Sequence, residues 1–155
     1  MTLFQEFNHV AITLNKELGI IPVLYGSLGL ERVTGMDFHP NDIDILVPLT
    51  FLEGKWDLLK AVMESLGYVL IDLHEHEFRK NKMKVGIAFI EDLKQFAEVD
   101  YHHLEAVKDN GAIYYMLSIS DYLKVYKKSF LDGYRRTKNN NKDQRKLEIL
   151  KQLMS

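Results

Sequence analysis

Two aspartates separated by one residue, Asp42 and Asp44, are the side chains whose types and spacing most directly indicate chemistry. They stand at the start of an apolar run that ends at Val47. If this run is a β-strand, residues two apart share a face, so the two carboxylates stand side by side while Ile43 and Ile45 turn toward a core. Neighbouring carboxylates repel each other unless a proton or a cation neutralises them. We therefore expect a site for a hard divalent cation such as Mg²⁺ or Mn²⁺ at Asp42 and Asp44.

A second candidate element precedes the aspartates. An apolar run over residues 20–25 ends at Gly26 and Ser27. Glycine lets backbone N–H groups approach a phosphate, and serine adds a hydroxyl donor. A metal held by two carboxylates is often shared with substrate phosphates. A Gly-Ser pair alone is more often a simple turn, and an Asp-x-Asp alone is often a solvated strand end, so the indication comes from their order and spacing together.

Tyr25-Gly26-Ser27 followed by Asp42-Ile43-Asp44-Ile45 resembles the DNA polymerase beta-like nucleotidyltransferase superfamily. The fourteen-residue spacer, residues 28–41, is slightly longer than the usual one. The resemblance implies a small mixed sheet flanked by helices. It also implies that Gly26 and Ser27 hold the phosphates of an NTP substrate and that Asp42 and Asp44 hold the divalent metal.

The superfamily normally has a third carboxylate on a later, neighbouring strand, as a general base or metal ligand. The predicted strand at this place, residues 84–90, has Gly86 and Ala88 where an acid would be sought. Of the acids nearby we prefer Asp100, which lies between hydrophobic neighbours, as the third catalytic residue. The alternatives are Glu77, Glu91 and Asp92.

The C-terminal part carries most of the positive charge. Residues 124–155 hold ten Lys and Arg against three Asp and Glu, whereas residues 1–123 hold ten against nineteen. This part looks like the tail of small bacterial stand-alone nucleotidyltransferases, and the resemblance implies that Arg136 and Lys142 contact nucleotide phosphates. The alternative is that Asp143 caps the last helix and Lys142 is simply solvated.

The remaining patterns predict an α+β fold with a mixed sheet of about four to five strands, flanked by helices and followed by a C-terminal helical part. Helical periodicity covers Leu3–Leu18, with Thr2 as N-cap and Gly19 as stop. Further helices are expected at 28–33, 56–66, 118–131 and from 143 onward. Strands are expected at 20–25 and 42–47, and 74–79 and 83–90 are expected to pair as a hairpin, while 68–73 and 113–117 have strand-like patterns that could add to the sheet. We expect one domain over 1–155, with a sheet-containing core at 1–117 and C-terminal helices at 118–155.

Composition narrows the class of protein. The chain has 155 residues, of which 46% are hydrophobic and 27% charged, as is ordinary for a globular domain. It has no cysteine, which excludes disulfides, thiolate metal sites and cysteine nucleophiles. No run approaches the roughly 20 apolar residues of a membrane span. We expect a soluble, cytoplasmic protein without a membrane partner.

The leading functional hypothesis is a Mg²⁺-dependent nucleotidyltransferase that moves a nucleoside monophosphate from an NTP to a hydroxyl and releases pyrophosphate. The acceptor could be a small molecule, a protein side chain or an RNA end, and the sequence selects none of them. The alternative is a catalytically silent relative that binds nucleotide or a protein partner. A third hypothesis, nucleic-acid binding through the basic tail, has no groove-reading motif to support it. The sequence does not indicate an oligomeric state.

Overall fold

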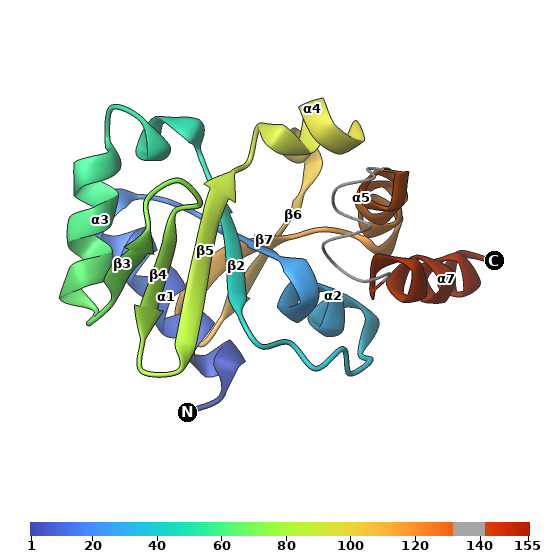
Figure 1. The fold of residues 1–155 in the computed structure, drawn as a ribbon, viewed down its shortest axis with the longest axis horizontal. Helices are drawn as coiled ribbons and strands as arrows, with labels where there is room; N and C mark the ends of the chain where they lie inside the picture. Colours follow the sequence, from blue (N-terminus) through green and yellow to red (C-terminus); the bar gives the residue numbers. More distant parts are fainter. Residues whose placement is uncertain (132–141) are drawn as a thin grey trace.

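Seven strands form one mixed sheet in the computed structural model, which describes residues 1–131 and 142–155. The strand order is β3-β4-β5-β2-β1-β7-β6 (Figure 1). The strands are β1 (Val23–Tyr25), β2 (Ile43–Val47), β3 (Val69–Asp72), β4 (Glu77–Lys80), β5 (Met83–Phe89), β6 (Glu105–Asp109) and β7 (Ala112–Met116). The helices are α1 (Leu3–Leu18), α2 (Gly26–Thr34), α3 (Trp56–Ser65), α4 (Asp92–Ala97), α5 (Ile119–Leu131) and α7 (Lys142–Met154), with short 3₁₀ turns η1 (Leu49–Leu52) and η2 (Tyr101–His103).

The centre of the sheet is mixed in direction. Strand β2 pairs antiparallel with β1 and parallel with β5, and β1 pairs parallel with β7. The outer pairs β3–β4, β4–β5 and β6–β7 are antiparallel. The predicted α+β class and mixed sheet are therefore confirmed, as is the hairpin of β4 and β5.

The sheet is larger than the four to five strands expected. Strand β6 was not predicted, because it forms the sheet edge and none of its residues is buried, so its sequence lacks a clear apolar alternation. It is held by antiparallel pairing with β7, where Val107 lies opposite Tyr114. Such pairing depends on a partner strand and is not readable from the edge segment alone.

The first helix is bounded as predicted, and the second is not. Thr2 caps α1, since its hydroxyl accepts from the Gln5 N–H at 3.1 Å, and Gly19 ends the helix with φ of 65°. Helix α2 begins at Gly26, directly after β1, rather than at Leu28. Because α2 begins at this position, Gly26 and Ser27 lie in the first turn of a helix.

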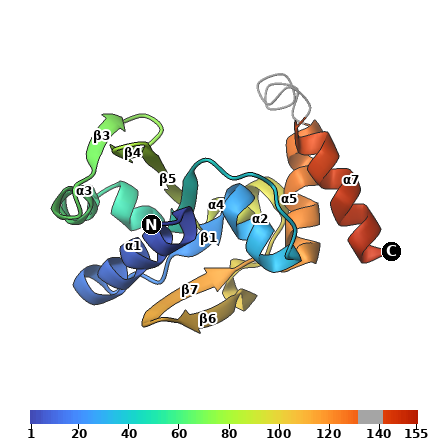
Figure 2. The ribbon, with the colours of Figure 1, turned by 90° about the horizontal axis from the view of Figure 1, so that it is seen from below.

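Helices cover both faces of the sheet. One core joins α1 and α3 to residues such as Ile43 and Ile45, which are fully or almost fully buried. The other core joins α4, α5 and α7 to the opposite face, which includes Leu46. Figures 1 and 2 show α5 and α7 side by side, with α2 between them and the sheet. Asp42 and Asp44 share the face of Leu46, so they point toward this second group of helices.

The C-terminal helices start where the sequence predicted. Strand β7 ends at Met116, and α5 follows at Ile119 with the Ser118 hydroxyl accepting from the Asp121 N–H at 3.1 Å. Helix α7 packs its buried Leu147 and Leu150 into the second core. None of the helices in the described residues is both long and apolar enough to cross a membrane.

Candidate active site

The turn from β1 into α2 brings Gly26 against Asp44. Tyr25 lies opposite Asp44 in the β1–β2 pairing, and Gly26 follows with φ of 64°. A side chain at Gly26 would collide with the Asp44 carboxylate. Two features therefore require glycine at position 26: the positive φ of the backbone and the close approach of the Asp44 carboxylate.

The two aspartates lie together as predicted. Ile43 and Ile45 are buried in the first core, so Asp42 and Asp44 stand on the opposite face of β2. Asp44 is half-buried, and this desolvation, followed by the charge of Asp42, raises the pKa of the Asp44 carboxyl to about 6. A nearby cation would therefore stabilise the ionised Asp44 carboxylate.

A third carboxylate lies on the same face, one strand farther than expected. Gly86 of β5 lies opposite Asp44 of β2 on one side and opposite Glu77 of β4 on the other. Gly86 has no side chain to separate them, and a Cβ there would lie 3.1 Å from Asp44 Oδ1. The charge of Glu77 contributes to the raised pKa of Asp44. Glu77 is thus the acid that the fold brings toward the aspartates.

The other acids considered as third carboxylate have different positions. Glu91 accepts from the Leu49 N–H with both carboxylate oxygens, at 3.1 and 3.3 Å. Asp92 lies in the first turn of α4. Asp100, our preferred candidate, caps η2 by accepting from the His102 N–H at 3.0 Å and pairs with the His103 ring at 3.1 Å. Both contacts lie at η2, in the segment that follows α4, and the role of Asp100 as third carboxylate stays a prediction.

Helix α7 brings a lysine to the β1–α2 turn. Lys146 Nζ donates to the Ser27 hydroxyl at 2.8 Å and lies 5.4 Å from the centre of the Tyr126 ring. Arg136, which we expected at the phosphates, lies outside the described residues. Lys142 is the first residue of α7, and its side chain is likewise outside what the structure describes. Lys146 was not singled out from the sequence, although it stands in the basic C-terminal part and one helical turn after Lys142.

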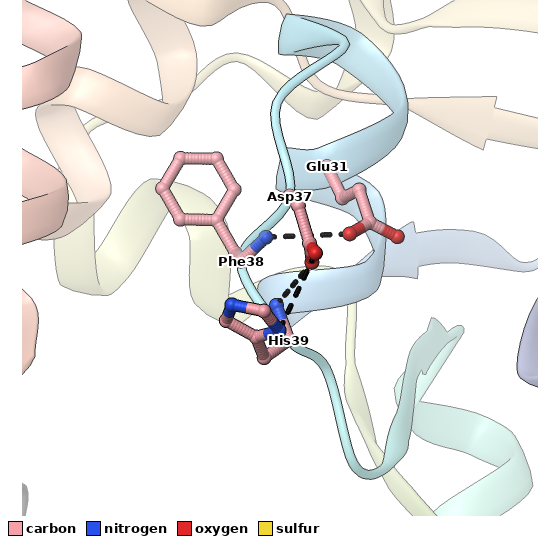
Figure 3. Close-up of polar contacts among 4 residues, drawn as sticks. All are labelled: Glu31, Asp37, Phe38 and His39. Carbon is pink, nitrogen blue, oxygen red and sulfur yellow. Dashed lines mark hydrogen bonds and ion pairs between the residues drawn. The ribbon is translucent and has the colours of Figure 1, made fainter.

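The connector between α2 and β2 is fixed by its own polar contacts (Figure 3). The Phe38 N–H donates to Glu31 Oε1 at 3.3 Å, which ties the connector to α2. Asp37 accepts from the His39 N–H at 2.7 Å and pairs with the His39 ring at 3.3 Å. The His39 N–H is also the main reason that the pKa of Asp37 is lowered. These contacts shape one wall of a cavity.

Two cavities meet at Asp44. The larger, about 510 Å³, has polar and charged walls formed by the connector, both aspartates and the basic residues of α7. Its lining includes Ser27, Asp42, Asp44, Arg145 and Lys146. The smaller, about 270 Å³, lies on the other side of Asp44 and is lined by aromatic and acidic groups. Its lining includes Tyr25, Glu75, Glu77, Tyr122 and Tyr126.

Tyr122 of α5 contacts the turn between β1 and α2. Its hydroxyl donates to the Gly26 carbonyl oxygen at 3.3 Å, and its ring stacks on those of Tyr25 and Tyr126 at 6.3 and 6.1 Å. Burial raises the pKa of the Tyr122 hydroxyl well above its usual range, so it remains a proton donor. Tyr122 thus helps to hold Gly26 in position.

The donor set fits a hard divalent cation. Asp42 and Asp44 offer adjacent carboxylate oxygens, the ligands that Mg²⁺ prefers, next to a cavity large enough for substrate phosphates. Within residues 1–131 and 142–155, no three His, Cys, Asp or Glu side chains lie together in a ready-made metal cluster. Such a cation would rely on the two aspartates and on oxygens supplied by the bound nucleotide.

The close approach of Gly26 and Asp44 makes a prediction about stability. Gly26→Ala is expected to lower the free energy of unfolding by about 1–2 kcal/mol for the positive φ and by about 1–3 kcal/mol more for the collision. Gly35→Ala is the matched control, because Gly35 also has positive φ but nothing lies within 4 Å of an added Cβ. Urea unfolding of both variants isolates the contact with Asp44. Equal losses in the two variants would contradict it.

Comparison with solved structures defines the class of fold. Across 99% of this chain and 92% of the other, the structure is similar to that of the antibiotic-resistance factor ANT(2'')-Ia, with a TM-score of 0.53 and 13% sequence identity. The chain therefore has a nucleotidyltransferase-like fold. No protein-family model matches the sequence. The chain is 63% identical over 154 residues to the uncharacterised protein YnaI of Bacillus subtilis (strain 168), covering 99% of both chains, and it belongs to the same family.

Proposed function

We propose that the protein is a Mg²⁺-dependent nucleotidyltransferase that transfers a nucleoside monophosphate from an NTP to a hydroxyl of an acceptor. One observation carries the proposal. A paired carboxylate, Asp42 and Asp44, and a serine–lysine contact, Ser27 to Lys146, face the same cavity. Divalent metal and nucleotide phosphates need these two kinds of group side by side.

In this proposal the larger cavity holds the NTP. Ser27 and Lys146 bind its phosphates, with Arg145 on the same wall. Asp42 and Asp44 hold a Mg²⁺ ion, which when bound would offset the charge of the phosphates. Gly26 and Tyr122 keep the β1–α2 turn in place, and Asp44 stands between nucleotide and acceptor.

The smaller cavity is the proposed acceptor site. It lies on the far side of Asp44, and its wall holds Glu77, which we propose in place of Asp100 as the group that accepts the proton of the attacking hydroxyl. Glu75 and Glu77 together favour an acceptor that carries positive charge, and the rings of Tyr25 and Tyr126 offer surfaces for stacking.

A second candidate function is nucleotide binding without transfer. The observation that favours it is that no three carboxylates form a metal cluster in the described part of the chain. In that case the larger cavity binds nucleotide in the same way, while Glu77 takes no part in a reaction.

Thermal unfolding with ATP, GTP, CTP or UTP, with and without Mg²⁺, tests the shared nucleotide site. At 100 times the dissociation constant a ligand adds about 2.7 kcal/mol, so we expect Tm to rise by roughly 5–10 °C with the preferred NTP only when Mg²⁺ is present. Asp42→Asn should lose this rise, and Asp57→Asn, an exposed aspartate on α3, should keep it. A rise of equal size in Asp42→Asn would refute the assignment.

Pyrophosphate release then separates the two candidate functions. If the protein is a transferase, Glu77→Gln should keep the Mg²⁺-dependent rise in Tm but release less pyrophosphate than the unaltered protein. A nucleotide-binding protein would release none in either form, with any acceptor added.

A further inference from the structure

Lys84 of β5 extends between carboxylates from two neighbouring segments. It lies two residues before Gly86, so it shares the face of the site. Its ammonium is 3.8 Å from Asp42 Oδ2 and 3.4 Å from Glu77 Oε2. The Lys84 side chain is 30% exposed, so the ammonium reaches solvent as well as the acids. One positive charge thus links an aspartate beside β2 to a glutamate of β4.

This ammonium offsets a concentration of negative charge. Lys84 pairs with Asp42 and Glu77, and Asp44 lies next to both, two residues after Asp42 and across Gly86 from Glu77. Because Gly86 leaves no side chain between Asp44 and Glu77, the three carboxylates stand on the same face of the sheet. Without a cation there, their mutual repulsion would be relieved only by protonation or by separation.

We propose that Lys84 is the internal counter-ion of this carboxylate site and that a divalent cation binds by displacing the Lys84 ammonium from Asp42. The inference rests on the proposed function, since it takes Asp42 and Asp44 as metal ligands. Both cations need the same carboxylate oxygens. The ion pairs at 3.4 and 3.8 Å are long and involve a flexible four-carbon side chain, so the Lys84 ammonium can leave Asp42 by rotation of the side chain alone.

The consequence is a site whose negative charge is partly offset by Lys84 until nucleotide arrives. A free metal ion competes with Lys84, and its affinity for the protein alone is reduced by that competition. A metal ion that arrives with an NTP brings phosphate oxygens as extra ligands and displaces the lysine more readily. Lys84 therefore couples metal binding to nucleotide binding.

Mn²⁺ titration of the nucleotide-free protein, followed by electron paramagnetic resonance, tests this inference. Lys84→Gln is expected to bind Mn²⁺ about tenfold more tightly than the unaltered protein. Lys84→Arg keeps the charge and should bind as weakly as the unaltered protein. Lys82→Gln removes an exposed lysine from the adjacent turn, and the change it causes, about twofold or less, measures the general effect of losing a positive charge.

The outcomes separate this inference from the proposed function. If Lys84→Gln binds Mn²⁺ no more tightly than Lys82→Gln, the counter-ion role is overturned, while loss of binding in Asp42→Asn still supports the metal site. If Asp42→Asn binds Mn²⁺ as well as the unaltered protein does, the metal site itself is refuted and the counter-ion role with it. Lys84→Met serves as a second neutral variant, and circular dichroism confirms that each variant is folded.

Discussion

Asp44→Asn is expected to abolish Mn²⁺ binding in the titration above and to lower Mg²⁺-dependent pyrophosphate release by about 100- to 1000-fold. Asp44 borders both cavities and touches the Gly26 turn, so its carboxylate is the group that nucleotide, metal and acceptor would share. Asparagine keeps the size of the side chain but offers one neutral amide oxygen instead of two carboxylate oxygens that share a negative charge. Activity within tenfold of the unaltered protein would exclude Asp44 from the reaction.

The same substitution is expected to make the metal-free protein more stable at neutral pH. The pKa of Asp44 is about 6 in the folded chain against 3.8 as its ordinary value. The folded state therefore binds this proton more tightly than the unfolded state does. Stability falls as pH rises from about 4 to about 6, and the full cost, at most about 3 kcal/mol, is present above that range. Asparagine cannot ionise and avoids this cost.

Urea unfolding in a chelating buffer at two pH values measures this effect. We expect Asp44→Asn to exceed the unaltered protein by about 1–3 kcal/mol at pH 7.5 and to match it near pH 4. Asp57→Asn on α3 should show no such gain. A loss of stability at pH 7.5 would mean that Lys84 and Lys146 already compensate the charge of Asp44. A variant that loses activity but gains stability indicates that the original residue is retained for catalysis and not for folding.

The part of the site that could be predicted is encoded locally. Asp42 and Asp44 share a face because side chains alternate in every strand, and the buried Ile43 and Ile45 fix which face that is. Gly26 could be recognised because a glycine after an apolar strand permits a tight turn. Each inference needed only residues within one strand and its end.

The part that could not be predicted depends on how distant segments pair. Glu77 reaches the site because β4 and β5 pair in the register that sets it opposite Gly86. A shift of one residue would turn Glu77 to the other face. Asp100 looked more suitable than Glu77 in sequence, because it lies between hydrophobic neighbours. The structure places it at a 3₁₀ turn, where capping η2 accounts for its type.

Lys146 illustrates the same limit over a longer range. It meets Ser27 across 119 residues of sequence, through the packing of α7 on α5. The charge imbalance of the C-terminal part left open whether its basic residues face the site or the solvent. It could not select Lys146 over Lys142 or Arg136, because the phase of a helix follows from which of its apolar side chains are buried.

Lys146→Met is expected to weaken binding of the preferred NTP with Mg²⁺ by about 10- to 100-fold. A charge-assisted contact to phosphate contributes roughly 1.5–3 kcal/mol, and each 1.4 kcal/mol is a factor of ten in affinity. Methionine retains much of the length and apolar volume of the lysine stem but removes the charge. Isothermal titration of the NTP identified by thermal unfolding measures the change. Lys151→Met is the matched control, because Lys151 is exposed on the same helix.

A structural role for Lys146 would give a different result. If its contact with Ser27 serves only to hold α7 against the β1–α2 turn, Lys146→Met should lower the free energy of unfolding without nucleotide and leave affinity per folded molecule unchanged. Ser27→Ala would then cause the same loss, because both variants break one hydrogen bond. If Lys146 binds phosphate, Lys146→Met should lose more affinity than Ser27→Ala, since the ammonium carries the charge and the hydroxyl does not.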